Sequence, residues 1–162
     1  MTLDSFWNII ELAWKDNSSL EQLRREAIES NEEELLFRLS EALSDAILAS
    51  YKKRLAGLSK EELTSFIHHL EERMYHIDRQ EIHEYTDGSD DGFLYCRCFI
   101  VGMGKEYYTI VDENPSKATA DAEAESFGFS AYGIYEELFN EAFDRYTHHS
   151  MESCSNADHW DV

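Results

Sequence analysis

The chain of 162 residues contains few of the residues that interrupt helices, with one proline and seven glycines. Proline breaks a helix interior and glycine weakens it, so long stretches of this sequence can remain helical. Runs of alternating β-branched residues are also missing, which excludes a fold built on half-buried strands. At this length the sequence therefore predicts an all-α protein, a single compact multi-helix domain.

Cysteines and long apolar runs are scarce as well. The three cysteines, Cys96, Cys98 and Cys154, form no regular disulfide framework, and a reducing compartment is the simplest interpretation. No apolar run of about 18 residues is present, so no transmembrane helix is expected. No basic region precedes the first apolar residues, so no signal peptide is expected either. These absences predict a cytoplasmic protein that does not associate with membranes.

Basic residues are few: 14 Lys and Arg face 34 Asp and Glu, which gives a formal net charge of −20. Such a surface repels phosphate backbones and anionic lipid heads. It attracts a positively charged protein over a Debye length, about 8 Å at physiological salt. The charge therefore argues against nucleic acid and membrane as partners and predicts a basic protein partner. It indicates nothing about the oligomeric state.

The common signatures of catalytic and cofactor sites are missing. The sequence has no phosphate loop, no nucleophile elbow and no HExxH motif, and Cys96 and Cys98 do not form a CxxC redox pair. The stretch from Asp87 to Gly92 is similar to the first half of an EF-hand loop, but Cys98 stands at the twelfth position, where calcium needs a glutamate. The histidines follow no structural zinc pattern. No cofactor, metal or catalytic residue is assigned, and a role other than catalysis is favoured.

Apolar residues at three- and four-residue steps predict the helices. They are expected over residues 4–15, 32–56, 90–101, 105–111 and 131–146, with capping boxes at Ser19–Gln22 and Ser59–Glu62 opening two more. Ser89 is expected to cap the helix over 90–101. The helical domain is expected to span residues 1–146. Residues 147–162 lack an amphipathic period, so they are predicted to form a mobile tail or to dock only through Trp160.

Arg97 is the charged residue in the most apolar setting, inside the run FLYCRCFIV of residues 93–101. An unpaired buried charge costs several kcal/mol, so Arg97 must reach solvent or find a carboxylate. The candidate partners are Glu11, Asp90 and Asp91. The sequence predicts an ion pair with one of them, and an anchor in a polar pocket is the alternative.

Two segments resemble a bacterial family of unknown function, domain family 4240. They are Phe6-Trp7 with Ile10-Glu11, and Ser89-Asp90-Asp91-Gly92-Phe93 with Tyr95, Arg97 and Ile100. The family patterns are Phe-Trp-x-x-Ile-Glu and Ser-Asp-Asp-x-Phe-x-x-Phe-Arg-x-Trp-Leu-Ile. The chain departs from them at Cys96, where an aromatic residue is usual, and at Phe99, where tryptophan is usual. The resemblance implies an all-helical domain and a binding or structural network of Glu11, Asp90, Asp91 and Arg97, and it implies no activity.

Three hypotheses for the function follow from these features. The leading one is an acidic binding protein that neutralises a basic partner, as an immunity protein or antitoxin does for a bacterial toxin. The second is a domain in which the four network residues line a polar pocket for a small ligand or for acid–base chemistry. The third is a nucleic-acid mimic, whose carboxylates would have to be spaced like phosphates.

Overall fold

Nine α-helices make up most of the computed structural model, which describes residues 1–161. They are α1 (Leu3–Lys15), α2 (Ser18–Ser30), α3 (Glu33–Leu43), α4 (Ala46–Ala56), α5 (Lys60–His76), α6 (Gln80–His83), α7 (Asp90–Gly102), α8 (Lys105–Glu113) and α9 (Glu125–Phe139). There are also two 3₁₀ turns in this part of the chain. Turn η1 (Pro115–Lys117) follows α8, and turn η2 (Ala157–His159) follows α9. About 70% of the chain is helical, and residues 1–161 contain no strand, so the predicted all-α class is confirmed.

Side-chain caps start α5 and α7 where the sequence predicts them. The Ser59 hydroxyl accepts a hydrogen bond from the Glu62 amide at 3.1 Å, and the Glu62 carboxylate accepts one from the Ser59 amide at 2.8 Å. This reciprocal pair confirms the predicted capping box at α5. The Ser89 hydroxyl likewise accepts from the Gly92 amide at 3.0 Å, which confirms the cap of α7.

The prediction of one helix over residues 32–56 is wrong. The structure has α3 and α4 instead, separated at Ser44 and Asp45. Apolar residues placed four apart advance by about 40° more than a full helical turn at each step, so their stripe drifts around one long helix. Breaking the helix lets both halves turn toward the core, and Leu39, Leu43 and Ile47 are all buried.

Two other boundaries also differ from the predicted ones. Asn17, rather than Ser19, caps α2, with its side-chain oxygen accepting from the Leu20 amide at 3.0 Å. The last helix, α9, covers residues 125–139 and not 131–146. It ends at Asn140, which adopts the left-handed conformation with φ of 53° that often terminates helices.

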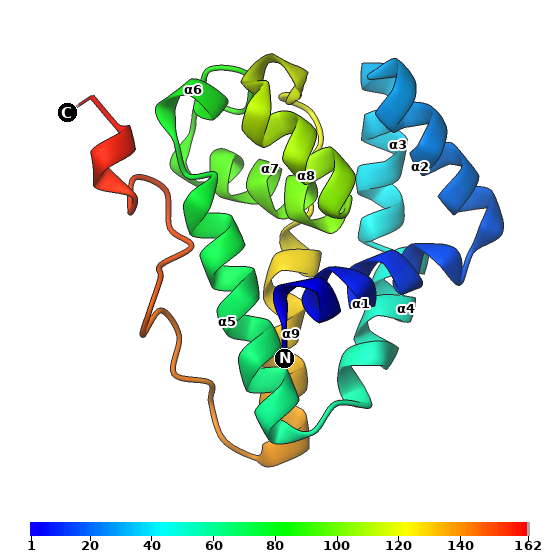
Figure 1. Ribbon diagram of the computed structural model, residues 1–162, viewed down its shortest axis with the longest axis vertical. Coiled ribbons are helices and arrows are strands. Elements are labelled where there is room, and N and C mark those ends of the chain that lie inside the picture. Colours follow the sequence, from blue (N-terminus) through cyan, green and yellow to red (C-terminus); the bar gives the residue numbers. More distant parts are fainter. Residues whose placement is uncertain (162) are drawn as a thin grey trace.

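Helix α7 lies at the centre of the molecule (Figure 1), packed against α3, α5, α8 and α9. Ten of its 13 residues are buried. A helix that is covered on nearly all sides needs apolar residues all around, which explains the run FLYCRCFIV. Helix α1 crosses the front of the molecule in Figure 1, and α2 and α3 pack together at one side.

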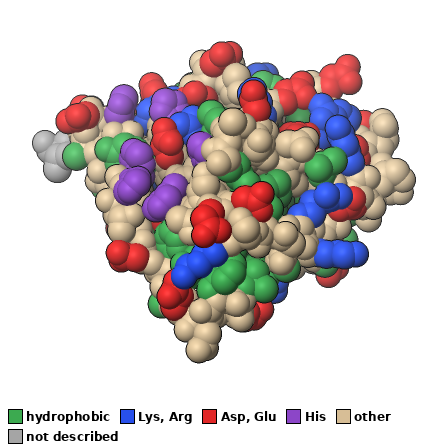
Figure 2. Space-filling model, turned by 60° about the horizontal axis from the view of Figure 1, so that its bottom comes forward, with side chains coloured by type: hydrophobic (Ala, Val, Ile, Leu, Met, Phe, Trp, Pro, Cys, Tyr) green, Lys and Arg blue, Asp and Glu red, His purple; other side chains and the backbone are tan. Residues whose placement is uncertain are grey.

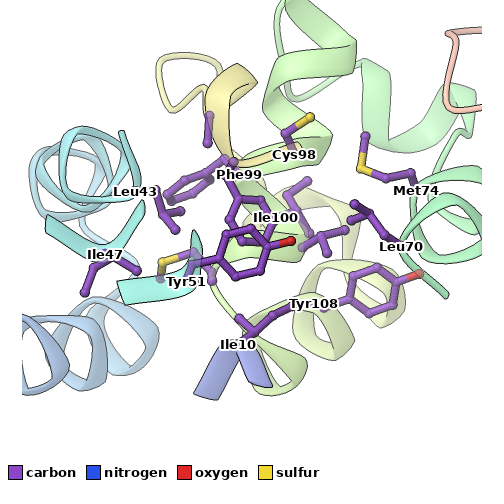
Figure 3. Close-up of a cluster of buried hydrophobic side chains, with 14 of the residues drawn as sticks. Ile10, Leu43, Ile47, Tyr51, Leu70, Met74, Cys98, Phe99, Ile100 and Tyr108 are labelled. Atoms are coloured by element: carbon purple, nitrogen blue, oxygen red, sulfur yellow. The ribbon is translucent and has the colours of Figure 1, made fainter. Parts of the chain in front are cut away.

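The core beside α7 is closely packed (Figure 3). Tyr51, Phe99 and Ile100 lie within it, together with Cys98. Burial raises the pKa of Cys96 and of Cys98 to about 12. Both thiols are therefore protonated at neutral pH, which makes them poor nucleophiles and metal ligands.

After α9 the chain runs beside α5 as an irregular segment toward α6 (Figure 1). We call residues 147–161 the C-terminal segment. The sequence predicts a mobile tail over residues 147–162, or docking through Trp160 alone. In the structure the C-terminal segment makes further contacts, with Met151 fully buried and Asn156 nearly so. Val162 lies outside the described residues. None of the helices in residues 1–161 has the length and apolar character needed to cross a membrane.

Candidate functional site

Two arginines are buried around α7, and each makes a different kind of contact. Arg24 and Arg97 are exposed by 1% and 0% of their surface. Burying a guanidinium is costly unless hydrogen-bond acceptors surround it, so acceptors are expected around both arginines.

Arg24 joins α1, α2 and the end of α7. Its Nη2 donates to the Glu11 carboxylate at 2.6 Å, its Nε to Glu21 at 2.7 Å, and its Nη1 to the Met103 carbonyl at 2.9 Å. Burial alone would lower the pKa of Arg24, but the hydrogen bonds to Glu11 and Glu21 raise it above its usual value. We call Glu11, Glu21, Arg24 and Met103 the Arg24 junction. In this network the guanidinium is buried and its two carboxylate partners are partly exposed.

Gly104 allows the Arg24 junction to close. Its φ of 95° lies in the region that favours glycine, and a side chain there would overlap the Glu11 carboxylate and the Arg24 guanidinium. Close by, the Trp14 indole donates to the Gly102 carbonyl at 2.8 Å. Gly104 is therefore needed for the approach of α1 and α2, whereas a side chain at Gly102, the last residue of α7, would meet Leu43 and Phe127.

Arg97 does not form the predicted ion pair. No carboxylate among residues 1–161 lies within 4.0 Å of it, whereas its Nη1 donates to the Met74 carbonyl at 3.0 Å and its Nη2 to the Met151 carbonyl at 2.8 Å. Asp90 is two helical turns away along α7, about 10 Å, which is too far for direct contact. Glu11 is held by Arg24.

The Ser153 hydroxyl fills the gap between Arg97 and the start of α7. It accepts from Arg97 Nη2 at 3.2 Å and donates to the Asp90 carbonyl at 2.7 Å. The Asp90 main chain, and not its carboxylate, is therefore linked to Arg97. The Asp90 and Asp91 side chains are exposed in the first turn of α7.

Asp78 is the second buried charge in contact with the C-terminal segment. It is fully buried, and its carboxylate accepts from the Cys154 amide at 3.1 Å and the Asn156 amide at 2.9 Å. Burial lowers the pKa of Arg97, and the negative charge of Asp78 is the main opposing influence. Arg97 therefore binds the C-terminal segment at Met151, and Asp78 binds it a few residues later, at Cys154 and Asn156.

The four predicted network residues do not gather around one cavity. Glu11 lines a cavity of about 590 Å³ between α1 and α8, together with Trp7, Arg25 and Lys105. The other three network residues do not line this cavity. Glu11 therefore belongs to the Arg24 junction and makes no contact with Arg97.

Four buried charges were not predicted from the sequence: Arg24, Glu71, Asp78 and Arg79. For Arg24 and Glu71 the available signal is helical spacing. Arg24 lies four residues after Leu20 and three before Ala27, and Glu71 lies four after Ile67 and three before Met74. A charged residue at an apolar step of a helix faces the core, so these positions predict buried charge.

Glu71 lies beneath the chain that follows α9. Its Oε1 accepts from the Tyr132 hydroxyl at 3.0 Å and from the Tyr146 amide at 3.4 Å. Its Oε2 is buried and has no hydrogen-bond partner among residues 1–161. Burial raises the pKa of Glu71, and these two hydrogen bonds only partly oppose that effect. The folded protein therefore favours the protonated carboxyl group more than the unfolded chain does.

The Glu71→Gln variant should change how stability depends on pH. A carboxyl group whose pKa is raised in the folded state makes the wild type more stable as pH falls from the alkaline side of that raised pKa toward 4.5, the ordinary value. The variant lacks this contribution, so its melting temperature relative to wild type should be most favourable at the alkaline end of this range and should decline toward pH 4.5. Thermal melts across this range measure the difference. Glu72→Gln, at the exposed neighbouring position, is the control, and equal pH dependence of the two variants would contradict the assignment.

An acidic patch lies beside the start of α7. It comprises Asp87, Asp121, Glu123 and Glu125. From residue 121 to 125 the three acidic side chains are exposed and alternate with buried Ala122 and Ala124, so the carboxylates all point outward. Burial and the charges of the other three members raise the pKa of Glu123. No ion pair to Lys, Arg or His within 4.0 Å involves these four carboxylates in the part of the chain that the structure describes.

Histidines gather on another face (Figure 2), where His68, His69, His148 and His149 line a cavity of about 530 Å³. The His68 and His148 rings stack with their centroids 4.4 Å apart. Burial, and then the neighbouring imidazoles, lower the pKa of His68. In residues 1–161, no group of three or more His, Cys, Asp or Glu side chains is arranged to hold a metal ion.

The fold and these contacts define a small all-helical protein whose buried charges join its helices and hold its C-terminal segment. The chain belongs to the family described as "Protein of unknown function (DUF4240)", whose family model matches residues 1–148. This match confirms the resemblance found in the sequence. Searches of curated proteins and of solved structures gave no match.

Proposed function

We propose that this protein binds a basic protein partner through the acidic patch, and that it acts as an immunity protein or antitoxin against a basic bacterial toxin. The observation that carries the proposal is the row of exposed carboxylates at Asp121, Glu123 and Glu125 beside Asp87. None of these four carboxylates forms an ion pair among residues 1–161, and burial together with the charges of the other three raises the pKa of Glu123. A basic partner would relieve this repulsion.

The overall charge supports the same proposal. With a net charge of −20, the chain attracts a cationic protein from a distance, which speeds association and makes it sensitive to salt. Most of the 14 basic residues are already engaged or buried, and seven of them form ion pairs within the chain. The acidic patch is therefore better placed to find its counterions on another molecule than on its own chain.

The test compares two variants that remove the same charge. One variant neutralises the patch with Asp121→Asn, Glu123→Gln and Glu125→Gln. The control carries Glu29→Gln, Glu34→Gln and Glu41→Gln, three exposed carboxylates on α2 and α3. In pull-downs from the native host, wild type and control should retain a basic protein that the patch variant binds at least about tenfold more weakly, since close charge pairs are worth roughly 1.5 kcal/mol or more.

Two outcomes would contradict the proposal. Equal loss of binding in both variants would mean that net charge, and not the patch, attracts the partner. Capture of only acidic or neutral proteins would remove the charge argument. The immunity role has its own measurement: expression of the captured protein should be toxic, and co-expression of wild type, but not of the patch variant, should protect the cells.

A further inference from the structure

The chain between α9 and Met151 runs beside α5 and is fixed at both ends (Figure 1). Asn140 ends α9 on one side, and Met151 is fully buried on the other. We call residues 141–150 the strap. It contains no helix, and in the described chain its main chain makes one hydrogen bond to the rest of the protein, from the Tyr146 amide to Glu71 at 3.4 Å. The strap is therefore held mainly by its side chains.

Ring contacts with α5 hold the strap. The His68 and His148 rings stack with their centroids 4.4 Å apart and their planes only 5° from parallel. His149 packs on Tyr75 at 5.0 Å between ring centroids, and Phe143 adds an edge contact to His68 at 5.6 Å. The closed position of the strap therefore depends on two imidazoles that face each other directly.

No opposite charge contacts this stacked pair. Among residues 1–161 no carboxylate lies within 4.0 Å of His68 or His148, and His68 Nδ1 is buried without a hydrogen-bond partner. If both rings are protonated, two like charges lie 4.4 Å apart. Even at the dielectric constant of water, two unit charges at such a separation shift an equilibrium about fivefold.

The other charged groups around His68 do not remove this repulsion. Lys60 binds Glu141 at 2.5 Å and Arg73 binds Glu72 at 3.0 Å, so these two carboxylates are already paired. The remaining titratable side chains of the two cavities beside His68 are Glu61 and His69 on α5, Tyr135 on α9, and Asp144 and His149 on the strap.

The direction of the pH effect follows from His68. Burial, and then the neighbouring imidazoles, lower its pKa. The closed strap therefore binds protons less readily than an open one, so closure is favoured above pH 6.5, the ordinary value, and weakens as the pH falls below it. Glu71, beneath the strap, acts in the opposite direction, because burial raises its pKa and acid favours its buried form. Variants at His148 leave Glu71 in place and isolate the histidine effect.

We propose that the strap is an acid-sensitive switch, which is closed while His68 or His148 is neutral and opens when both are protonated. Opening uncovers the rings of Tyr132 and Tyr135, on which Phe143 packs at centroid distances of 5.8 and 5.1 Å. Both ends of the strap stay fixed, so it closes again when the pH returns to neutral. The switch does not depend on the acidic patch.

The first test follows the imidazole resonances of the full chain by NMR from about pH 8 to about pH 5. His148→Phe keeps a ring for stacking but removes one of the two charges, so the pKa of His68 should rise in this variant. His76→Gln is the control, because it removes an imidazole that pairs with Asp112 at the other end of α5. The control should leave the pKa of His68 unchanged. An unchanged value in His148→Phe would show that the two rings do not titrate together.

The second test measures opening through hydrogen exchange of the Tyr146 amide, divided by its chemical exchange rate at each pH. In wild type and in His76→Gln the open fraction should rise at least about fivefold between about pH 7.5 and about pH 5.5. In His148→Phe it should change by less than about twofold, because only one ring can be charged. The amides in the middle of α7 should keep their protection throughout.

An open fraction that stays constant in wild type, or that rises equally in His148→Phe, would overturn the proposal. An equal loss of protection in α7 would also overturn it, since acid would then act on the whole fold. His148→Gln is a second variant that removes both the stacking and the charge at an exposed position. Its strap should be more open than that of wild type at neutral pH and should no longer respond to acid, whereas a retained response would assign the switch to other groups.

Discussion

Replacing Arg24 with methionine should lower the free energy of unfolding by about 3 kcal/mol, the low end for removing one partner of a buried ion pair, because the Glu11 and Glu21 carboxylates are partly exposed and keep Arg25 beside them. Glu11 and Glu21 would both lose their partner within the junction, and the Met103 carbonyl would lose its donor. Urea denaturation followed by circular dichroism measures the loss. This is the largest effect that we expect from substituting any one charged residue.

Arg25→Met is the matched control for this prediction. Arg25 is the next residue on α2 and also pairs with Glu11 and Glu21, but 44% of its side chain is exposed. Exposed ion pairs contribute about 0–1 kcal/mol, so the control should lose little stability. Adding Glu11→Gln to Arg24→Met should restore part of the loss, and the double-mutant cycle gives the coupling energy. A loss for Arg24→Met within about 1 kcal/mol of the control would contradict the buried network.

Local signals in the sequence predict the starts of α5 and α7, and a drifting apolar stripe explains the error over residues 32–56. Ser59 and Ser89 act through neighbours three residues away, so their caps could be found without knowing the fold. The break at Ser44 and Asp45 depends instead on which way two halves of an apolar stripe must face. That direction is set by the packing of α3 and α4 against other helices, and no local signal gives it.

Some features of the candidate site could likewise be predicted from local sequence, and others could not. The burial of Arg97 could be predicted from the apolar run around it, but its partners could not, because they lie in the non-periodic C-terminal segment. The link between Glu11 and Arg24 joins residues 13 apart on two different helices. A search for charges at apolar helical steps would have found Arg24. The acidic patch was not predicted either, because Asp87 is separated from residues 121–125 by α7 and α8 and shares no motif with them.

Arg97→Met should cost less than Arg24→Met, about 1–3 kcal/mol. The methionine would leave the buried carbonyls of Met74 and Met151 without their donor, and an unsatisfied buried polar group costs roughly that amount. It would also remove the cost of burying a guanidinium that has no carboxylate within 4.0 Å in the described chain. These opposing effects make the net loss moderate.

The loss caused by Arg97→Met should be concentrated in the C-terminal segment. Hydrogen exchange of the Cys154 and Asn156 amides should become faster, because the adjacent anchor at Met151 is gone, while the amides of α2 keep their protection. Arg97→Lys is the informative second variant. It keeps the positive charge near Asp78 but loses the planar fork that reaches two carbonyls at once, so it should restore little of the protection. If Arg97→Met destabilised the whole protein as much as Arg24→Met and left the segment's exchange unchanged, Arg97 would be a core residue and not the anchor of the C-terminal segment.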